Sequence, residues 1–295
     1  MPRYARIPEA VEAAPFLKWA GGKRDLLEQY GPLFPAGPVR AYFEPFVGSG
    51  AVFFALRGRG FAAHYHLSDA NEELINVYRV VQGDLAGLIA RLREHQRCHS
   101  EDYYYRVRDQ DREPGWPDGV GPTERAARMI YLNRTCYNGL WRVNSAGRFN
   151  VPVGRYRRPR ILDEPRLRAA ARALEGVCLN CLPFAEAVAG AQAGDFVYFD
   201  PPYVPASHTA NFTSYNPDGF GPAQQAALAR TFRDLHKRGC RVMLSNSNTP
   251  LVRELYRGFR LVEVRARRRI NSRSDGRGPV GELVVLNYDP SGAER

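Results

Sequence analysis

The chain has 295 residues, of which 44% are hydrophobic and 12% aromatic, which is enough for a packed core. Its 42 Lys and Arg residues outnumber 31 Asp and Glu residues, so the formal net charge is +11, which favours a polyanionic partner such as nucleic acid. No apolar run approaches the roughly 18 to 20 residues of a membrane span, and the first residues lack the apolar stretch of a signal peptide, so we expect a cytoplasmic protein outside the membrane.

The five cysteines are odd in number and scattered along the chain, as expected for reduced thiols rather than a disulfide framework. Cys178 and Cys181 have the spacing of half a zinc or redox site, but no second pair accompanies them. We therefore expect no metal site.

Six short segments have the β-prone, hydrophobic pattern of core strands. They are residues 41–46, 63–68, 196–199, 241–245, 259–264 and 282–288. Helical periodicity lies between several of them, as in residues 224–237. This alternation predicts an α/β fold of the Rossmann-like kind, with a mostly parallel sheet covered on both faces. A polar loop joins the last two strands, which predicts an antiparallel hairpin at the sheet edge.

Residues 76–162 break this rhythm. They are rich in Arg, Tyr and Asn, include a Pro/Gly-rich stretch at residues 113–122, and show no clear buried strand. We predict that they form an inserted, mainly helical domain, and that residues 1–75 and 163–295 together form the α/β domain.

The first motif in chain order is Phe16-Leu-Lys18-Trp19-Ala-Gly-Gly-Lys23-Arg24. A phosphate loop needs Ser or Thr after its lysine, so Arg24 argues against an ATP site. Trp19 offers a stacking face and Lys23 a charge, although a buried Trp beside a solvated Lys is an equally simple interpretation.

The strand at residues 41–46 leads into Phe46-Val-Gly48-Ser49-Gly50. Two glycines at a strand-to-helix turn let a ligand approach the backbone, although a plain tight turn has the same pattern. About 20 residues on, Asp69 ends the next strand, where a ribose-binding acid belongs; it could instead cap the following helix. Together the two features favour a nucleoside-containing cofactor, with NAD and S-adenosylmethionine both open.

The strand at residues 196–199 runs into Asp200-Pro201-Pro202-Tyr203. Prolines cannot continue a ladder, so Asp200 ends the strand at the sheet edge where ligands bind. A carboxylate and a backbone carbonyl can accept hydrogen bonds from the exocyclic amine of a nucleobase, which exposes its lone pair. Tyr203 supplies a platform on which a flipped base can stack. A sulfonium methyl placed in line would complete a direct displacement without a metal.

In order along the chain, residues 16–23, 43–50, 68–71 and 200–203 resemble the motifs of the Dam-like (D12 class) DNA adenine-N6 methyltransferases. Residues 137–156 are similar to that family's target-recognition hairpin, and residues 269–272 and 276–278 to its C-terminal loop. Residues 97–122 have no counterpart that we can align.

The resemblance implies S-adenosylmethionine as cofactor and assigns two sets of residues. The cofactor-binding set is Trp19, Lys23, Phe46, Gly48, Ser49, Gly50, Asp69 and Asp200, of which Asp69 would bind the ribose hydroxyls. In the catalytic set, Asp200 and the Pro201 carbonyl would hold the target amine, Pro202 would stiffen the turn, and Tyr203 would stack on adenine.

The resemblance also implies duplex DNA as partner and assigns roles in the hairpin. Tyr137 would wedge into the duplex, Asn138 would support the extruded site, and Arg142 would read a guanine edge. Leu140 and Pro152 would pack on thymine. The other expected DNA-binding residues are Lys18, Asn150, Arg155, Asn271 and Arg277. The hairpin favours GATC as target, reached by base flipping, and we expect a monomer in solution.

Three other functions explain the same motifs less well. A nicotinamide oxidoreductase gives no reason for the Asp200 motif beside a basic hairpin, and a non-catalytic DNA-binding module leaves the cofactor motifs without purpose. A cytosine-C5 methyltransferase needs a nucleophilic cysteine in a Pro-Cys pair, which the chain lacks. A methyltransferase with another target sequence, or with an RNA or protein amide substrate, stays open, although the protein amide enzymes usually carry Asn in place of Asp200.

Overall fold

A seven-stranded sheet forms the centre of the computed structural model, which describes residues 11–204, 220–266 and 280–290. Along the sheet the strand order is β3-β2-β1-β4-β5-β7-β6. The strands are β1 (Val39–Glu44), β2 (Ala62–Asp69), β3 (Cys178–Cys181), β4 (Phe196–Phe199), β5 (Arg241–Ser247), β6 (Arg260–Ala266) and β7 (Val280–Leu286). The first five in this order are parallel, whereas β7 is antiparallel to both β5 and β6. The predicted mostly parallel sheet with an edge hairpin is confirmed.

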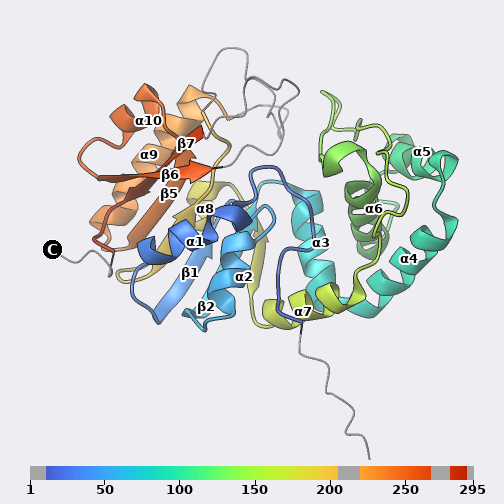
Figure 1. Cartoon of the computed structure of the whole chain (residues 1–295), viewed down its shortest axis with the longest axis horizontal. Coiled ribbons are helices and arrows are strands. Elements are labelled where there is room, and N and C mark those ends of the chain that lie inside the picture. Colours follow the sequence, from blue (N-terminus) through green and yellow to red (C-terminus); the bar gives the residue numbers. More distant parts are fainter. Residues whose placement is uncertain (1–10, 205–219, 267–279, 291–295) are drawn as a thin grey trace, which may run out of the picture.

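Helices cover both faces of this sheet. The helices of the described ranges are α1 (Leu27–Tyr30), α2 (Ala51–Arg57), α3 (Glu72–Gly83), α4 (Leu85–Cys98), α5 (Glu101–Asp109), α6 (Pro122–Thr135), α7 (Glu164–Leu174), α8 (Phe184–Ala187), α9 (Pro222–Lys237) and α10 (Pro250–Leu255), of which α4, α5 and α6 pack on one another and on α3 rather than on the sheet. Short 3-10 turns are η1 (Lys23–Leu26), η2 (Gly31–Leu33), η3 (Gln110–Arg112) and η4 (Tyr137–Gly139). Figure 1 shows α9 and α10 beside β5 to β7 at one end of the molecule and α4 to α6 at the other.

The central strand β4 shows why the sheet has two cores. All four of its residues are buried, and they alternate between faces as strand geometry requires. Phe196 and Tyr198 join the core that includes α2, α3 and α7, whereas Val197 and Phe199 join the core beneath α9 and α10. The continuous hydrophobic run in the sequence therefore marks a strand covered on both sides.

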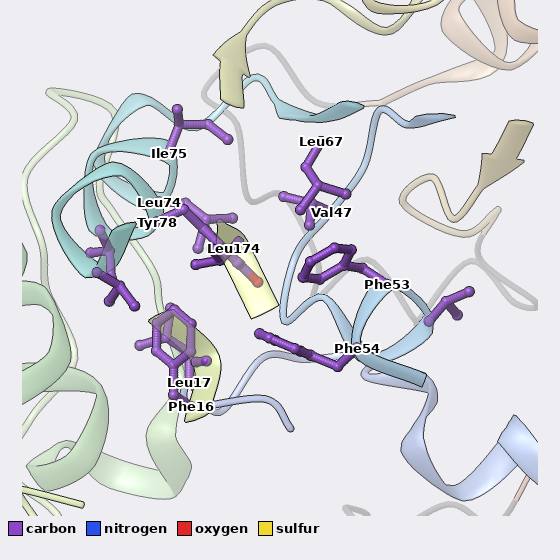
Figure 2. Close-up of a cluster of buried hydrophobic side chains, with 14 of the residues drawn as sticks. Phe16, Leu17, Val47, Phe53, Phe54, Leu67, Leu74, Ile75, Tyr78 and Leu174 are labelled. Atoms are coloured by element: carbon purple, nitrogen blue, oxygen red, sulfur yellow. The ribbon is translucent and has the colours of Figure 1, made fainter. Parts of the chain in front are cut away.

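The N-terminal segment is anchored in the first of these cores. Phe16 packs edge-on against Phe54 of α2 and Tyr78 of α3, with ring centroids 6.3 Å and 5.3 Å apart. Figure 2 shows Phe16 and Leu17 between these helices. This anchor fixes the chain that follows it, including Trp19 and Lys23.

The sequence analysis missed strand β3. It pairs in parallel with β2, from His66 opposite Cys178 to Asp69 opposite Cys181. Only Leu179 of its four residues is buried, so no hydrophobic run announces this edge strand. All five cysteines are free, as expected.

Residues 76–162 are mainly helical in the structure. Helix α6 is buried along most of its length and packs against α3, α4 and α5. The predicted domain boundary after residue 75 lies inside α3, and this helix packs on β2 and β3 as well as on α6. The division into two domains stays a prediction, with α3 shared between them.

Among the helices within the described ranges, none is long and apolar enough to cross a membrane.

Candidate active site

A cavity of about 310 Å³ opens at the carboxyl ends of β1, β2 and β4. All four sequence motifs contribute to it, as predicted for this edge of a parallel sheet. Its wall includes Trp19, Lys23, Glu44, Phe46, Gly48, Ser49, Asp69, Asn71, Tyr198, Asp200, Pro201, Pro202, Tyr203 and Glu282. The chain thus brings segments from residue 19 to residue 282 to one place.

The turn after β1 requires glycine at two positions. Gly48 has φ 47° and Gly50 has φ 68°, both in the left-handed region that side chains disfavour. A Cβ at Gly48 would lie 2.8 Å from Cδ1 of Trp19, and one at Gly50 would lie 2.8 Å from the Tyr78 hydroxyl oxygen. The Trp19 ring therefore lies directly against the backbone of this turn.

Asp69 is tied to the same turn. One of its carboxylate oxygens accepts a hydrogen bond from the Gly48 amide at 3.2 Å, and the other accepts one from the Asn71 amide at 3.0 Å. Burial raises the pKa of Asp69 to about 6, although these bonds oppose the shift. The cap of α3 is Asn71, whose side chain accepts from the Leu74 amide at 3.0 Å. The helix-cap interpretation of Asp69 is therefore wrong.

Asp200 and Lys23 form a buried ion pair at the centre of the cavity wall. Lys23 Nζ lies 2.8 Å from Asp200 Oδ1, and Ser245 donates a second hydrogen bond to the same oxygen at 2.9 Å. Lys23 is only 4% exposed, so the solvated-lysine interpretation is wrong. Burial raises the pKa of Asp200, whereas the charge and hydrogen bond of Lys23 act in the opposite direction.

The Tyr203 side chain is held between a cation and a carboxylate. The Lys23 ammonium lies 4.7 Å from the centroid of the Tyr203 ring. The Tyr203 hydroxyl donates to Oε2 of Glu282 on β7 at 2.8 Å. Lys23, which we expected only at the cofactor, thus contacts both Asp200 and Tyr203.

The backbone after Pro201 is fixed by side chains from neighbouring elements. Gln225 of α9 donates to the Pro202 carbonyl at 2.9 Å. The Val204 amide donates to Asn246 Oδ1 at 3.1 Å, and the Ser247 hydroxyl donates to the Val204 carbonyl at 2.6 Å. These bonds hold the motif's backbone in one conformation.

Sequence reasoning missed the residues that make these contacts. Ser245 and Asn246 follow the hydrophobic residues 242–244 of β5 and are themselves buried, so polar side chains at the end of a hydrophobic strand were the available signal. No signal marked Glu282, because it is 79 residues from Tyr203 and reaches the site through the antiparallel pairing of β7 with β5.

The segment predicted to recognise DNA is a hairpin. Cys136 bridges to Val153 and Val143 to Phe149, both antiparallel. Trp141 is buried against Phe149, with ring centroids 4.9 Å apart. Tyr104 of α5 donates to the Val151 carbonyl at 2.8 Å, and the Phe149 amide donates to Asp111 at 2.7 Å, so the helical region supports the hairpin backbone.

Five of the ten residues predicted to touch DNA are exposed on this hairpin. Tyr137 is 50% exposed, and Asn138 next to it has φ 56°, which is rare for a residue other than glycine. Arg142 is exposed, and its Nε donates to Asn150 Oδ1 at 2.7 Å. Pro152 and Arg155 are exposed and Leu140 is half-buried. Asn271 and Arg277 lie outside the described residues, as do the other predicted loop segments between 267 and 279.

Lys18 connects the N-terminal motif to the hairpin. Asn133 of α6 accepts a hydrogen bond from the Lys18 amide at 2.8 Å and donates to the carbonyls of Lys18 at 2.7 Å and Gly139 at 3.0 Å. The Lys18 ammonium donates to the Tyr156 hydroxyl at 3.2 Å. No motif or pattern predicted this role for Asn133, which is fully buried.

Within residues 11–204, 220–266 and 280–290, no group of three or more His, Cys, Asp or Glu side chains is arranged to hold a metal ion.

Comparisons with known proteins match almost the whole chain. Residues 19–270 match the sequence model of the D12 class N6 adenine-specific DNA methyltransferases. A type II methyltransferase of Lactococcus lactis subsp. cremoris, M1.LlaDCHI, is 42% identical over 280 residues, which cover 94% of this chain and 96% of that protein. The type II methyltransferase M.MjaIII of Methanocaldococcus jannaschii is 41% identical over 291 residues, covering 94% and 100%. The DNA adenine methylase of Escherichia coli strain K12 is 38% identical over 277 residues, covering 93% and 95%.

Proposed function

Because the chain belongs to the D12 class of N6 adenine-specific DNA methyltransferases, we propose that it flips an adenine out of duplex DNA and methylates it at the Asp200 motif. Its substrate class is DNA, and the family implies S-adenosylmethionine as methyl donor. This membership argues against the nicotinamide oxidoreductase and the non-catalytic DNA-binding module. The residues, the target sequence and the flipping step are the parts that we propose.

The cavity suits S-adenosylmethionine in shape and donor set. Because Gly48 has no side chain, Trp19 packs directly against the backbone of the glycine turn in the cavity wall. Asp69 offers carboxylate oxygens in the position where ribose hydroxyls bind, and Phe46, Ser49 and Trp19 supply the remaining wall. When bound, the cofactor would supply an electrophilic methyl group.

Asp200 and Pro201 would orient the nucleophile. The adenine amine is weak because its lone pair is delocalised into the ring, and acceptors placed at its two hydrogens favour a tetrahedral nitrogen. Within the described ranges, the Pro201 carbonyl has no hydrogen-bond partner, which leaves it free to accept one of these hydrogens. Asp200 would accept the other, and the charge of Lys23 2.8 Å away opposes the rise in the pKa of Asp200 that burial causes. The lone pair exposed in this way would attack the methyl group of the bound cofactor, whose sulfonium would leave as a thioether, and the proton lost by the nitrogen would pass to Asp200 and then to water.

The hairpin would extrude the adenine and read its neighbours. Tyr137 is exposed on an ordered turn, as a wedge requires, and Asn138 adjoins it. The planar Arg142 side chain matches O6 and N7 of guanine, and Asn150 orients it. Leu140 and Pro152 would contact the thymine methyl group. These assignments favour GATC, and Lys18 beside Tyr156 adds a further contact to the same site.

The observation that carries the proposal is the Lys23–Asp200 pair in one cavity with the glycine turn and Tyr203. The test follows a labelled methyl group from S-adenosylmethionine into two duplexes that differ only by scrambling one GATC. We expect N6-methyladenine in the GATC duplex alone. Label in both duplexes would move the target elsewhere, whereas no label in either would contradict the proposed function.

A further inference from the structure

One carboxylate outside the sequence motifs reaches the proposed base-stacking residue. Glu282 lies on β7, opposite Ser247 of β5. Its Oε2 accepts hydrogen bonds from the Tyr203 hydroxyl at 2.8 Å and from the Tyr30 hydroxyl at 3.4 Å. Glu282 therefore links β7, the motif after β4, and helix α1.

The surroundings of Glu282 are unusual for an acid. The next four residues, 283–286, are all buried in the two cores, and Glu282 itself lines the cavity. Burial raises the pKa of Glu282, and Lys23 with the two tyrosine hydroxyls opposes the shift. A carboxylate placed here is costly unless it is hydrogen-bonded, and the bonds it makes run to Tyr203 and to the buried Tyr30.

We propose that Glu282 is a positioning residue for methyl transfer, which sets the plane of the Tyr203 ring while Tyr30 steadies Glu282. The inference rests on the proposed function. A tyrosine ring can rotate about two side-chain bonds, and stacking needs one orientation. The bond at the hydroxyl end removes that freedom. Because the Lys23 ammonium covers one ring face, the adenine stacks on the other.

The test compares substitutions that remove the same hydrogen bond from either end. Glu282→Ala removes the acceptor, Tyr203→Phe removes the donor but keeps the ring, and Glu282→Gln keeps an acceptor oxygen. Glu263→Ala is the matched control, because Glu263 lies on the adjacent strand β6 with its side chain 63% exposed and paired to Arg253. For each variant we would measure kcat, KM for duplex DNA, and the Kd of S-adenosylmethionine.

We expect Glu282→Ala and Tyr203→Phe each to lower kcat about 10- to 100-fold, because a displaced reacting group costs rate rather than affinity. The Kd of S-adenosylmethionine should change less than about twofold. The double variant should be no slower than the slower single variant, since both lose one shared bond. Glu282→Gln should recover most of the rate, and Glu263→Ala should match the wild type.

Several results would overturn the inference in an active wild-type enzyme. One is a normal kcat in Glu282→Ala. A second is a double variant whose loss of kcat is the product of the two single losses. A third is a fully active Tyr203→Phe together with an inactive Glu282→Ala, which would leave Glu282 with a purely structural role. A wild-type protein without methyltransferase activity on any duplex would instead contradict the proposed function, and this inference with it.

Discussion

The motif after β4 and the recognition hairpin present their side chains in opposite ways. Residues 200–204 are fixed by partners from β5, β7 and α9, and the central carboxylate shares a buried ion pair. The hairpin has a supported backbone, yet Tyr137 and Arg142 extend into solvent. The first arrangement suits chemistry, which needs preorganised groups. The second suits readout, which needs side chains that can enter a groove.

The two regions also differ in charge. The cavity wall contains four acids, Glu44, Asp69, Asp200 and Glu282, together with Lys23, which pairs with Asp200. Over residues 155–160, at the end of the hairpin and just beyond it, the exposed charged residues are arginines. Substitutions in the cavity should therefore change turnover with DNA binding intact, and substitutions in the hairpin should change DNA selection with the chemistry intact. Each prediction below tests one side of this contrast.

The largest effect is expected from Asp200→Ala. In the proposed mechanism this substitution removes an acceptor from the target amine, and the loss of one preorganised group typically costs about 10³-fold in rate. Single-turnover methyl transfer measures the loss, and fluorescence anisotropy measures duplex binding, which should stay close to that of the wild type. Asp118→Ala, at an exposed position of the helical region, is the control. Near-normal turnover would remove Asp200 from the mechanism.

Glu44 should make stability depend on pH. Burial raises the pKa of Glu44 from its usual 4.5 to about 8, so the folded protein keeps a proton that the unfolded chain loses. The stabilisation is complete below pH 4.5 and is lost as pH rises to about 8, with a slope of at most about 1.4 kcal/mol per pH unit.

Glu44→Gln, neutral at every pH, should flatten this dependence. Urea unfolding at several pH values across that window measures it for both proteins. Glu254→Gln, at an exposed ion pair on α10, should leave the wild-type slope unchanged. If the free energy of unfolding depended on pH in the same way in the wild type and in Glu44→Gln, Glu44 would be ionised in the folded protein and the prediction would be wrong.

On the hairpin side, Arg142→Ala should relax discrimination at one guanine by about 1 to 3 kcal/mol, or roughly 5- to 150-fold. A panel of duplexes with single base changes measures this as a ratio of kcat/KM values. Arg148→Ala is the matched control, because Arg148 is exposed on the same hairpin but has no predicted base contact. Unchanged ratios in the Arg142 variant would place guanine readout elsewhere.

The cavity side was the easier one to predict from sequence. Asp69 and Asp200 each end a hydrophobic run and so mark the end of a strand. Because the carboxyl ends of parallel strands lie at the same edge of a sheet, the fold class predicted that these two acids lie close together. The residues that hold these side chains in place could not be predicted from the fold class. Glu282 and Ser245 depend on the register of β7 against β5, and the pairing of Lys23 with Asp200 depends on how Phe16 anchors the N-terminal segment. Short polar β3 lacked any pattern at all.

The smallest effect is expected from Arg155→Ala, at an exposed position near the end of the hairpin. If Arg155 contacts a phosphate, the variant releases one counterion fewer when it binds DNA. The slope of log K for DNA binding against log salt concentration should therefore become shallower by about 0.9. Affinity should fall equally for GATC and scrambled duplexes, because a phosphate contact carries no sequence information. Arg257→Ala, at an exposed position just after α10 where Arg257 pairs with Glu254, is the control. A loss of affinity confined to the GATC duplex would instead show that Arg155 takes part in base recognition. The residues that recognise bases would then extend beyond Arg142 to a position assigned here to a phosphate contact.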